Sequence, residues 1–486
     1  MNILGQAYVL TKNKKYAEEF VNQVNDWIEN NPVYFGVNWT CAMDVAIRAA
    51  NWLVGVEYFL EGKILGRDFL KRFYASIYEH AKFILDHLEY SPLLTKNHYL
   101  SNIVGLFFIA VHYPFYKESR KWRDFALTEL IKEMQKQVYD DGCNFEASTS
   151  YHRLTLEMFF YAELLGKRAN IKFPLEYSVK LKKMFEFSLY CVKPDGAVPQ
   201  IGDNDSGRFL VFAQRPGLEH KYLLSLAAVY YGDSQFKLSS FDFDEEAFWL
   251  FGESGKNIHT KLSYRDTPLK SRSFPNAGWY IIRHNEDYRF ISRGPNGQNG
   301  SGGHAHNDKL SFELMLDKND VFIDPGTYIY IPYPEWRNKF RSTRYHNTVS
   351  IDEVEQNDIS GKLFTMRQGV RICSSKLEEK GDVIVFQGKI EYINEKIFHT
   401  RTIVYHAKNG KVDVIDLILS KNKEPRHYSL NLFLSKSSQL QGSINSISIN
   451  SQRYSLISNK LNWRQYREFY SPEYGIKEDI ICLSIN

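Results

Sequence analysis

The first half of the chain carries apolar residues at helical spacing. Between about residues 12 and 250, Leu70, Phe73, Ile77 and Ile84 are separated by steps of three, four and seven residues. Residues at these steps lie on one face of an α-helix, so the pattern predicts amphipathic helices. Short polar turns, such as residues 61–63 and 193–196, separate the helical segments. We therefore predict a stack of helical hairpins, without a fixed-period sequence repeat.

The second half changes to alternating apolar and polar positions, which is the pattern of β-strands. Around residues 310–317, Phe312 and the leucines would face one side of a sheet, and Ser311, Glu313 and Asp317 the other. Further strand candidates are Gly278–His284, Val383–Ile390, His399–Tyr405, Val412–Leu419 and His427–Leu434. So many short strands with few helical segments favour an antiparallel β-sandwich.

A polar stretch rich in Gly, Ser, Lys and Pro lies between these halves, from about Gly252 to Asn276. We interpret it as the crossing between two domains, because it has little periodicity of either kind. The predicted division is a helical domain over residues 1–255, a crossing over 256–276 and a β-sandwich domain over 277–486. A chain of 486 residues is long enough for each domain to have its own core.

Charge and hydropathy argue against two classes of partner. The 61 lysines and arginines nearly balance the 57 aspartates and glutamates, and the net charge of +4 gives no dominant field for nucleic acid. The longest apolar stretch, Ile103–Val111, is too short to span a bilayer. Any attraction of an anionic ligand must therefore be local. The sequence leaves the oligomeric state open.

The cysteines do not indicate a disulfide scaffold. Cys41, Cys143, Cys191, Cys373 and Cys482 are widely scattered, odd in number and without a C-x-x-C pair. The first ten residues lack the basic and long apolar regions of a signal peptide. Neither an oxidised framework nor an export signal is thus visible.

The densest group of chemically active residues lies in and after Ser301–Leu314. His304 and His306 are two residues apart, and on an extended segment they point to the same side. Asp324 follows an apolar run, and His346 precedes another predicted strand. The imidazoles of His306 and His346 with the carboxylate of Asp324 can fill three positions of a tetrahedral zinc site. The histidines could equally be hydrogen-bonded residues at a sheet edge, and the spacing does not decide.

Two predicted helix starts in the first half carry further candidates. Asn97 and His98 could bind a carboxylate with help from the positive end of a helix, although Asn97 could also be a simple cap. Tyr151 follows the N-cap cluster Ser148–Ser150, so its ring should project from the first turn of a helix. Glu146 and His152 could orient this ring. A tyrosine is a natural proton donor, but Tyr151 could also be one of 32 tyrosines that only pack a helix face.

Longer motifs around these residues resemble the heparinase II/III-like polysaccharide lyases, a group that also includes alginate lyases. In the second half they are Gly302-Gly-His-Ala-His-Asn-Asp308, Phe322-Ile-Asp-Pro-Gly326 and Arg341-Ser-Thr-Arg-Tyr-His-Asn-Thr-Val349. In the first half they are Lys96-Asn-His-Tyr-Leu-Ser-Asn102, Asp141-Gly-Cys-Asn-Phe-Glu-Ala-Ser-Thr-Ser-Tyr-His152 and Asp195-Gly-Ala-Val-Pro-Gln-Ile-Gly-Asp-Asn-Asp205. The motifs occur in the order of the family and span roughly residues 36–350.

The resemblance implies an α+β multidomain fold, in which an N-terminal incomplete (α/α) toroid precedes a C-terminal antiparallel β-sandwich. It implies catalytic roles for Asn97, His98, Tyr151 and His304. It also implies a zinc ion, structural or ordering the site, at His306, Asp324 and His346. We further predict substrate contacts from Glu146, Gln200, Arg208 and Arg341. Many members of the group are exported, which favours a periplasmic or secreted protein, but without a visible signal peptide the compartment stays open.

The predicted function follows from the chemistry of uronic acids. β-Elimination at O4 removes the weakly acidic C5 proton beside a carboxylate, so the carboxylate must be neutralised, a base must take the proton and an acid must protonate the leaving oxygen. We therefore predict a lyase that acts on an anionic, uronate-containing polysaccharide. A uronate C5-epimerase and a zinc-stabilised polysaccharide-binding protein are the alternatives. The presence of all four acid–base and carboxylate-binding candidates argues against mere binding, but the sequence does not separate lyase from epimerase.

Overall fold

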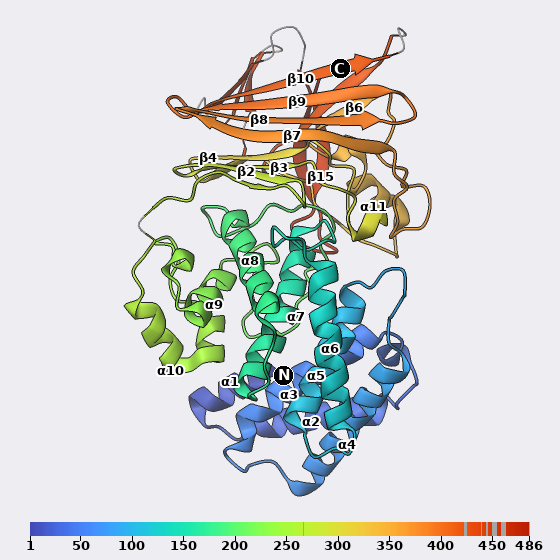
Figure 1. The fold of residues 1–486 in the computed structure, drawn as a ribbon, viewed down its shortest axis with the longest axis vertical. Helices are drawn as coiled ribbons and strands as arrows, with labels where there is room; N and C mark the ends of the chain where they lie inside the picture. The colour runs from blue at the N-terminus through green and yellow to red at the C-terminus, as the bar shows by residue number, and fades with distance from the viewer. Residues whose placement is uncertain are drawn as a thin grey trace.

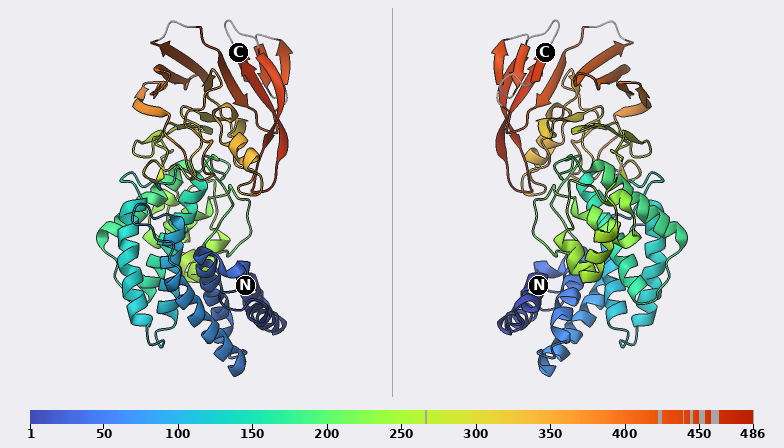
Figure 2. Two further views of the ribbon diagram at one scale, coloured as in Figure 1. Left: turned by 90° about the vertical axis from the view of Figure 1, so that its right-hand side faces the viewer. Right: turned by 90° about the vertical axis from the view of Figure 1, so that its left-hand side faces the viewer.

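Helices form the first half of the protein and strands the second (Figure 1). The structure is a computed structural model that describes residues 1–265, 267–421, 425–438, 440–443, 446–449, 454–457 and 463–485. In Figure 1 the strands lie above the helices, and the two views of Figure 2 show the same division from either side. No helix among the described residues is long and apolar enough to cross a membrane.

The helices of the first half form an incomplete (α/α) toroid, as predicted. They are α1 (Asn2–Thr11), α2 (Lys15–Asn30), α3 (Ala42–Leu60), α4 (Arg67–Asp86), α5 (Asn97–His112), α6 (Ser119–Gln137), α7 (Thr149–Arg168), α8 (Leu175–Cys191), α9 (Tyr222–Tyr231) and α10 (Glu245–Lys261). Helices α1, α3, α5 and α7 pack side by side, while α2 packs on α4 and α6 on α8. Alternate helices thus form an inner and an outer layer, as expected for stacked hairpins. Short 3₁₀ turns lie at Val37–Trp39 and Ser234–Phe236.

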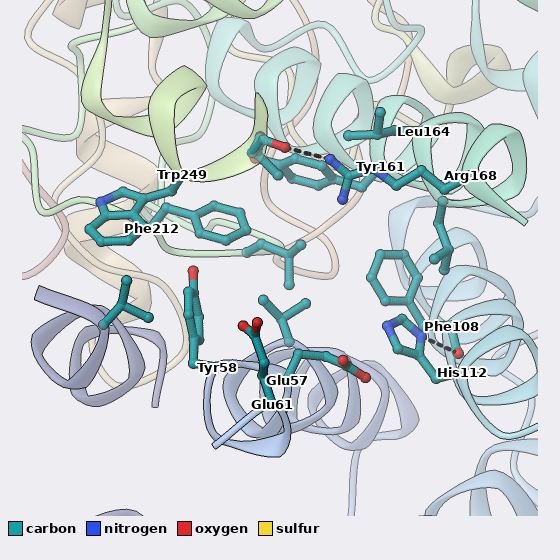
Figure 3. A pocket seen from close by; sticks show the side chains of 15 residues that line it. Glu57, Tyr58, Glu61, Phe108, His112, Tyr161, Leu164, Arg168, Phe212 and Trp249 are labelled. Atoms are coloured by element: carbon teal, nitrogen blue, oxygen red, sulfur yellow. Dashed lines mark hydrogen bonds between the residues drawn. The ribbon is translucent and has the colours of Figure 1, made fainter. Parts of the chain in front are cut away.

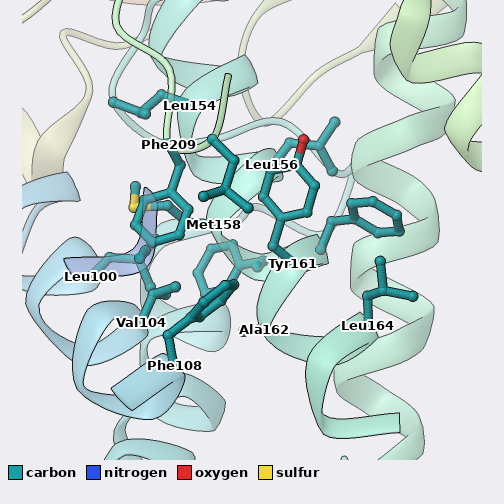
Figure 4. Close-up of a cluster of buried hydrophobic side chains, with 14 of the residues drawn as sticks. Leu100, Val104, Phe108, Leu154, Leu156, Met158, Tyr161, Ala162, Leu164 and Phe209 are labelled. Carbon is teal, nitrogen blue, oxygen red and sulfur yellow. The ribbon is translucent and has the colours of Figure 1, made fainter. Parts of the chain in front are cut away.

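Helices α5 and α7 form the centre of the helical core. Nearly every residue from Leu100 to Ala110 and from Thr149 to Leu164 is buried. A helix that is buried on all sides needs apolar residues all round rather than on one stripe, which explains the continuous apolar run in α5. Figure 4 shows side chains of both helices, among them Val104, Phe108 and Met158, packed together.

The strands form antiparallel sheets. They are β1 (Arg272–Phe274), β2 (Trp279–His284), β3 (Asp287–Ser292), β4 (Phe312–Leu316), β5 (Asn319–Phe322), β6 (Val349–Ile351), β7 (Val370–Lys380), β8 (Val383–Tyr392), β9 (Ile397–His406), β10 (Lys411–Ser420), β11 (Tyr428–Phe433), β12 (Leu440–Ser443), β13 (Ser446–Ile449), β14 (Tyr454–Ile457), β15 (Trp463–Tyr470) and β16 (Glu478–Ile485). The sheet orders are β1-β2-β3-β4-β5, β10-β9-β8-β7, β15-β16-β11-β6 and β12-β13-β14. A short helix, α11 (Pro334–Phe340), and 3₁₀ turns at Gln298–Gly300 and Thr343–Tyr345 lie between strands.

The sheet β1–β5 is buried on both faces. Along β2, Trp279 and Ile281 belong to the core shared with the helices, whereas Tyr280 and Ile282 belong to the core between the sheets. Successive side chains of a strand point to opposite faces, so one strand can serve both cores. Trp279 stacks on Phe187 of α8 with ring centroids 5.1 Å apart. This sheet is therefore the joint between the two halves of the molecule.

The predicted strands and helices are found, with three differences in detail. All five strand candidates and the alternation around Phe312 are confirmed, but Glu313 on the other face is buried rather than exposed, since that face meets the helices. The predicted crossing begins within α10, which continues to Lys261. Its backbone leaves helical geometry at Gly252, where φ is 60°, and this break is where the periodicity was lost. Other strands, among them β3, β7 and the pair β15–β16, were not predicted, and in β15 exposed charged residues mask the alternation. The domain limits themselves stay a prediction.

Candidate active site at the joint between the domains

The buried carboxylate of Asp203 lies at the centre of the candidate site. Asp203 belongs to the loop between α8 and α9 and is fully buried. Its Oδ2 lies 3.0 Å from Nδ1 of His304, and its Oδ1 lies 3.1 Å from Nε2 of His306. Arg337 of α11 donates to Oδ1 at 2.6 Å. Burial acts to raise the pKa of Asp203, but Arg337 and the two histidines hold it well below its usual range, so the carboxylate only accepts hydrogen bonds.

Tyr151 and His304 meet face to face across the joint. Their ring centroids are 3.7 Å apart and the ring planes are inclined by 19°. The Ser148 hydroxyl caps α7 by accepting a hydrogen bond from the Tyr151 backbone N–H, as the sequence predicted. The Tyr151 hydroxyl donates to Asp205 at 2.9 Å. Burial and the charges of Asp205 and Asp203 raise the pKa of Tyr151 well above its usual value, so the phenol keeps its proton at neutral pH.

Asn97 is joined to His304 through Glu146. Asn97 is the first residue of α5 and is buried; its backbone N–H and its Nδ2 donate to Glu146 at 2.8 and 2.7 Å. The oxygen that accepts from Nδ2, Oε2, also lies 3.4 Å from Nε2 of His304. One of the two Nδ2 hydrogens of Asn97 is thereby used, and Oδ1 makes no hydrogen bond to any described residue. The amide therefore keeps donor and acceptor capacity for a ligand.

His98 turns away from Asn97 toward a second group of polar side chains. Its Nδ1 lies 2.7 Å from Glu89 and 4.0 Å from the sulfur of Cys41. Partial burial would lower the pKa of His98, but the hydrogen bonds to Cys41 and Glu89 raise it to about 10. The side chain is 49% exposed. His98 is thus a cation at the rim of the site rather than in its interior.

The predicted metal ligands lie together beside the acid–base pair. One ligand atom from each of His306, Asp324 and His346 lies within 4.8 Å of the other two, and all three residues are buried. The Nδ1 of His346 lies 2.7 Å from Asp324. Within the described chain, Nδ1 of His306 and Nε2 of His346 have no hydrogen-bond partner. In each ring the nitrogen that faces a carboxylate carries the proton, so in a neutral ring the unpartnered nitrogen holds a lone pair. These residues fit a metal ion.

The four predicted substrate contacts have partners within the protein. Glu146 binds Asn97, and Gln200 donates to the backbone oxygen of Ser471 at 2.7 Å. Arg208 pairs with Glu157 and Glu246, and Arg341 donates to backbone oxygens, including that of Ile359 at 3.0 Å. All four are buried or nearly so. These contacts give them a part in holding the site, and direct contact with a substrate stays a prediction.

Other residues of the site were not singled out from the sequence. Arg337 binds Asp203, and its guanidinium lies 5.0 Å from the Tyr330 ring and 4.5 Å from the Phe364 ring. The Phe364 ring in turn meets His304 at 5.9 Å. These residues lie in none of the motifs, and only their aromatic neighbourhood could have hinted at a sugar-binding wall. Asp203 lies within the motif Asp195–Asp205, but nothing in the sequence marks its central place.

A cavity of about 340 Å³ in the helical half is distinct from this site (Figure 3). Its lining includes Phe108 and His112 near the end of α5 and Arg168 at the end of α7. Asn97 and Tyr151 lie at the opposite, N-terminal ends of these helices. Since α5 has 16 residues, its two ends are about 24 Å apart. The candidate site is instead where the positive ends of both helices meet the β-strands.

Comparisons with known proteins cover nearly the whole chain. The family described as Heparinase II/III N-terminus matches residues 1–215, and the one described as Heparinase II/III-like, C-terminal, matches residues 266–468. A heparin-sulfate lyase of Pedobacter heparinus is 26% identical over 363 residues, which are 72% of this chain and 50% of that protein. A heparin-sulfate lyase of Bacteroides thetaiotaomicron is 24% identical over 417 residues, 81% of this chain and 56% of that protein. The chain thus spans about half the length of the curated relatives it matches.

Solved structures show the same fold. A crystal structure of heparinase III superposes with a TM-score of 0.75 at 19% identity, covering 99% of this chain and 72% of that one. A heparan sulfate lyase mutant from Pedobacter heparinus gives a TM-score of 0.67 at 21% identity, with coverages of 99% and 72%. At these identities the likeness establishes the toroid and β-sandwich architecture.

Replacing Asp203 by Asn should destabilise the protein by about 3–5 kcal/mol, because it leaves the buried charge of Arg337 without its counter-ion. Urea unfolding followed by circular dichroism measures the change. Asp382→Asn, which removes a surface partner of Lys408, is the control and should cost less than about 1 kcal/mol. Equal stability of Asp203→Asn and the wild type would contradict the central place of this carboxylate.

Proposed function

Because the chain belongs to the heparinase II/III-like family, we propose that it is a polysaccharide lyase that cleaves an anionic, uronate-containing polysaccharide by β-elimination. The observation that carries the proposal is the stacked pair of Tyr151 and His304, linked through Glu146 to Asn97. The relatives named heparin-sulfate lyase make heparan sulfate the first substrate to test.

The elimination requires that the uronate carboxylate be neutralised while the C5 proton leaves. In our proposal the free N–H of Asn97 donates to this carboxylate, and the imidazole of His98 contributes at the rim. Both side chains lie at the N-terminal end of α5, where the helix dipole also favours an anion. Negative charge that develops on the carboxylate as the C5 proton leaves is stabilised by the same donors.

His304 and Tyr151 divide the proton transfers between them. Both ring nitrogens of His304 face a carboxylate, Nδ1 that of Asp203 at 3.0 Å and Nε2 that of Glu146 at 3.4 Å. In our proposal the closer carboxylate, that of Asp203, accepts the proton on Nδ1, which leaves the lone pair of a neutral ring on Nε2 as the base for the C5 proton. Tyr151 holds its proton, since its pKa is raised, and delivers it to O4 as the C4–O4 bond breaks. A double bond forms between C4 and C5. The phenolate then regains a proton from solvent, and His304 releases to solvent the proton that it took from C5.

We also propose that His306, Asp324 and His346 hold a zinc ion. Two imidazole nitrogens and a carboxylate suit zinc better than calcium or magnesium, which prefer oxygen ligands. The elimination needs no metal-activated hydroxide nucleophile, so the role is to fix the loop that carries His304 and His306. Asp203 binds both histidines, which ties the metal group to the base.

Two alternatives differ in their products. A C5-epimerase would use the same base and carboxylate contacts but would return a proton to the opposite face of C5 and keep the C4–O4 bond. A polysaccharide-binding protein would need neither Tyr151 nor His304 as a proton carrier. In an epimerase the proton donor would have to lie on the opposite face of C5 from the base. The ring of Tyr151 instead stacks on the imidazole of His304, which favours donation of its proton to the leaving oxygen.

The purified protein should release unsaturated uronate products from at least one chain in a panel of heparan sulfate, heparin, hyaluronan and alginate. The products absorb in the ultraviolet and are read continuously. Tyr151→Phe removes only the phenolic hydroxyl and should lower turnover by about two or more orders of magnitude, and His304→Ala should do the same. Their double variant should be little worse than the worse single one, because the pair acts as one unit.

Two results would redirect this interpretation. Exchange of the C5 hydrogen with deuterated water, without unsaturated product, would indicate the epimerase. Full activity of Tyr151→Phe on a confirmed substrate would refute the assigned acid.

Asn97→Ala should lower turnover on the same substrate by about a hundredfold or more, the scale for losing a donor to a developing anion. Circular dichroism should show an unchanged fold. Asn409→Ala, in a turn of the β-domain, is the matched control and should keep full activity. Near-normal turnover of Asn97→Ala would place the carboxylate contact elsewhere.

Protein purified without chelator should contain about one zinc per chain by elemental analysis. His346→Ala should lose the metal and melt at a lower temperature, since metal binding contributes to folding free energy. His406→Ala alters a partly exposed histidine that pairs with Asp413 and should retain the zinc. Absence of zinc from the freshly purified wild type would remove the metal from the proposal.

A further inference from the structure

Lys96 places an unpaired cation beside the acid–base pair. It is the N-cap residue of α5, directly before Asn97, and its side chain is partly buried. Its Nζ makes no ion pair or hydrogen bond with any described residue, although the nearby charge of Glu146 acts on it. A partly desolvated ammonium without an acceptor is costly, which points to a ligand as its missing partner.

The loop that carries His304 packs against this ammonium. A Cβ atom added to Gly303 would lie 3.3 Å from Nζ of Lys96 and 2.4 Å from Oε1 of Gln298. Gln298 is fully buried and accepts a hydrogen bond from the Gly303 N–H at 2.9 Å, which fixes the orientation of its amide. Its Nε2 has no partner among the described residues. Glycine at 303 therefore lets the loop next to His304 approach the Lys96 ammonium and the Gln298 amide closely.

The other cations of the site already have partners, and Arg341, which faces no carboxylate, is buried and donates to backbone oxygens. Arg337 binds Asp203, Arg208 binds Glu157 and Glu246, and His98 binds Glu89. Glu146, whose charge acts on Lys96, already accepts two hydrogen bonds from Asn97. Lys96 is thus the cation of this part of the described chain whose charge is still available to a ligand.

We propose that Lys96, at the start of α5 beside Gly303, binds an acidic group of the polysaccharide, a carboxylate or a sulfate. This inference rests on the proposed function for the identity of the ligand. The ammonium is a point charge with three rotatable donors, so it accepts either planar or tetrahedral oxyanions. Its place between the N-terminus of α5 and His304 puts the bound group next to the reacting sugar.

Steady-state kinetics on the substrate that the panel identifies test the proposal. Lys96→Met keeps the aliphatic stem, removes the charge, and should lower kcat/KM by about tenfold to a hundredfold, the scale of one charge-assisted hydrogen bond. The loss should appear mainly in KM, and Lys96→Arg should recover most of it. Lys408→Met, at a residue whose side chain is 81% exposed in the β-domain, should match the wild type. Unchanged kcat/KM in Lys96→Met would overturn the proposal.

Cleavage of modified substrates shows whether the group bound by Lys96 is a sulfate or a carboxylate. If Lys96 binds a sulfate, a desulfated chain should be cleaved equally well by the wild type and Lys96→Met. If it binds a carboxylate, the two proteins should differ on the desulfated chain as much as on the native one. Either pattern supports the site. A defect that persists unchanged when Arg replaces Lys96, together with unchanged KM, would assign the residue a structural role instead.

Two further measurements keep the test independent of catalysis and of variant stability. Calorimetric binding of the same chains should be weaker for Lys96→Met even if no panel member is cleaved, which separates failure of this inference from failure of the lyase assignment. In the wild type, bound polysaccharide should protect Lys96 from acetylation, measured by mass spectrometry, while Lys408 stays reactive. Equal labelling of Lys96 with and without polysaccharide would refute the site without any substitution.

Discussion

The buried carboxylate of Asp203 is the contact on which the geometry of the site depends. It comes from the helical half, and its three partners, His304, His306 and Arg337, come from the β-half. A buried charge is tolerated only when its hydrogen bonds are complete, so the four side chains must be placed together. One consequence is chemical: the same carboxylate fixes which nitrogen of His304 carries the proton and which nitrogen of His306 is left to a metal.

The joint between the domains keeps this arrangement rigid. The sheet β1–β5 contributes one face to the helical core and the other to the sandwich core, so the halves cannot separate without exposing the apolar face that packs on the helices. Polar contacts reinforce the joint, among them the pair of Lys193 with Asp320 at 2.8 Å and the hydrogen bond from Gln200 to Ser471. Tyr151 on a buried helix and His304 on a loop of the β-half can therefore stay stacked without a covalent link. The precision that proton transfer needs comes from packing around the site.

Much of the fold could be predicted from the sequence, because periodicity is a local property. The strands β8, β9 and β10 alternate clearly, and α4 and α8 keep helical spacing. Periodicity failed at Gly252, where one residue breaks α10, and at β15, where charged side chains cover the pattern. The site could be predicted where motifs place its residues close together, as for His304 and His306. The partners of Asp203 could not, since they lie 101, 103 and 134 residues away in the chain and nothing local marks a buried ion pair.

The near-neutral charge of the chain restricts how it could hold the proposed polyanionic substrate. With a net charge of +4 spread over 486 residues, the protein has no strong long-range field to attract a polyanion. Salt at physiological concentration would also screen such a field over about 8 Å. The site itself contains the carboxylates of Asp203, Asp205 and Glu146, which would repel a uronate. Arg337 compensates the first, the Tyr151 hydroxyl donates to the second, and Asn97 donates twice to the third. Because these carboxylates have partners within the protein, they do not cancel the positive groups nearby. The N-terminal ends of α5 and α7 and the cations at the start of α5 can then act on the ligand. Attraction of the proposed substrate would therefore be short-ranged, and it would act only on an acidic group that has already reached the joint between the domains.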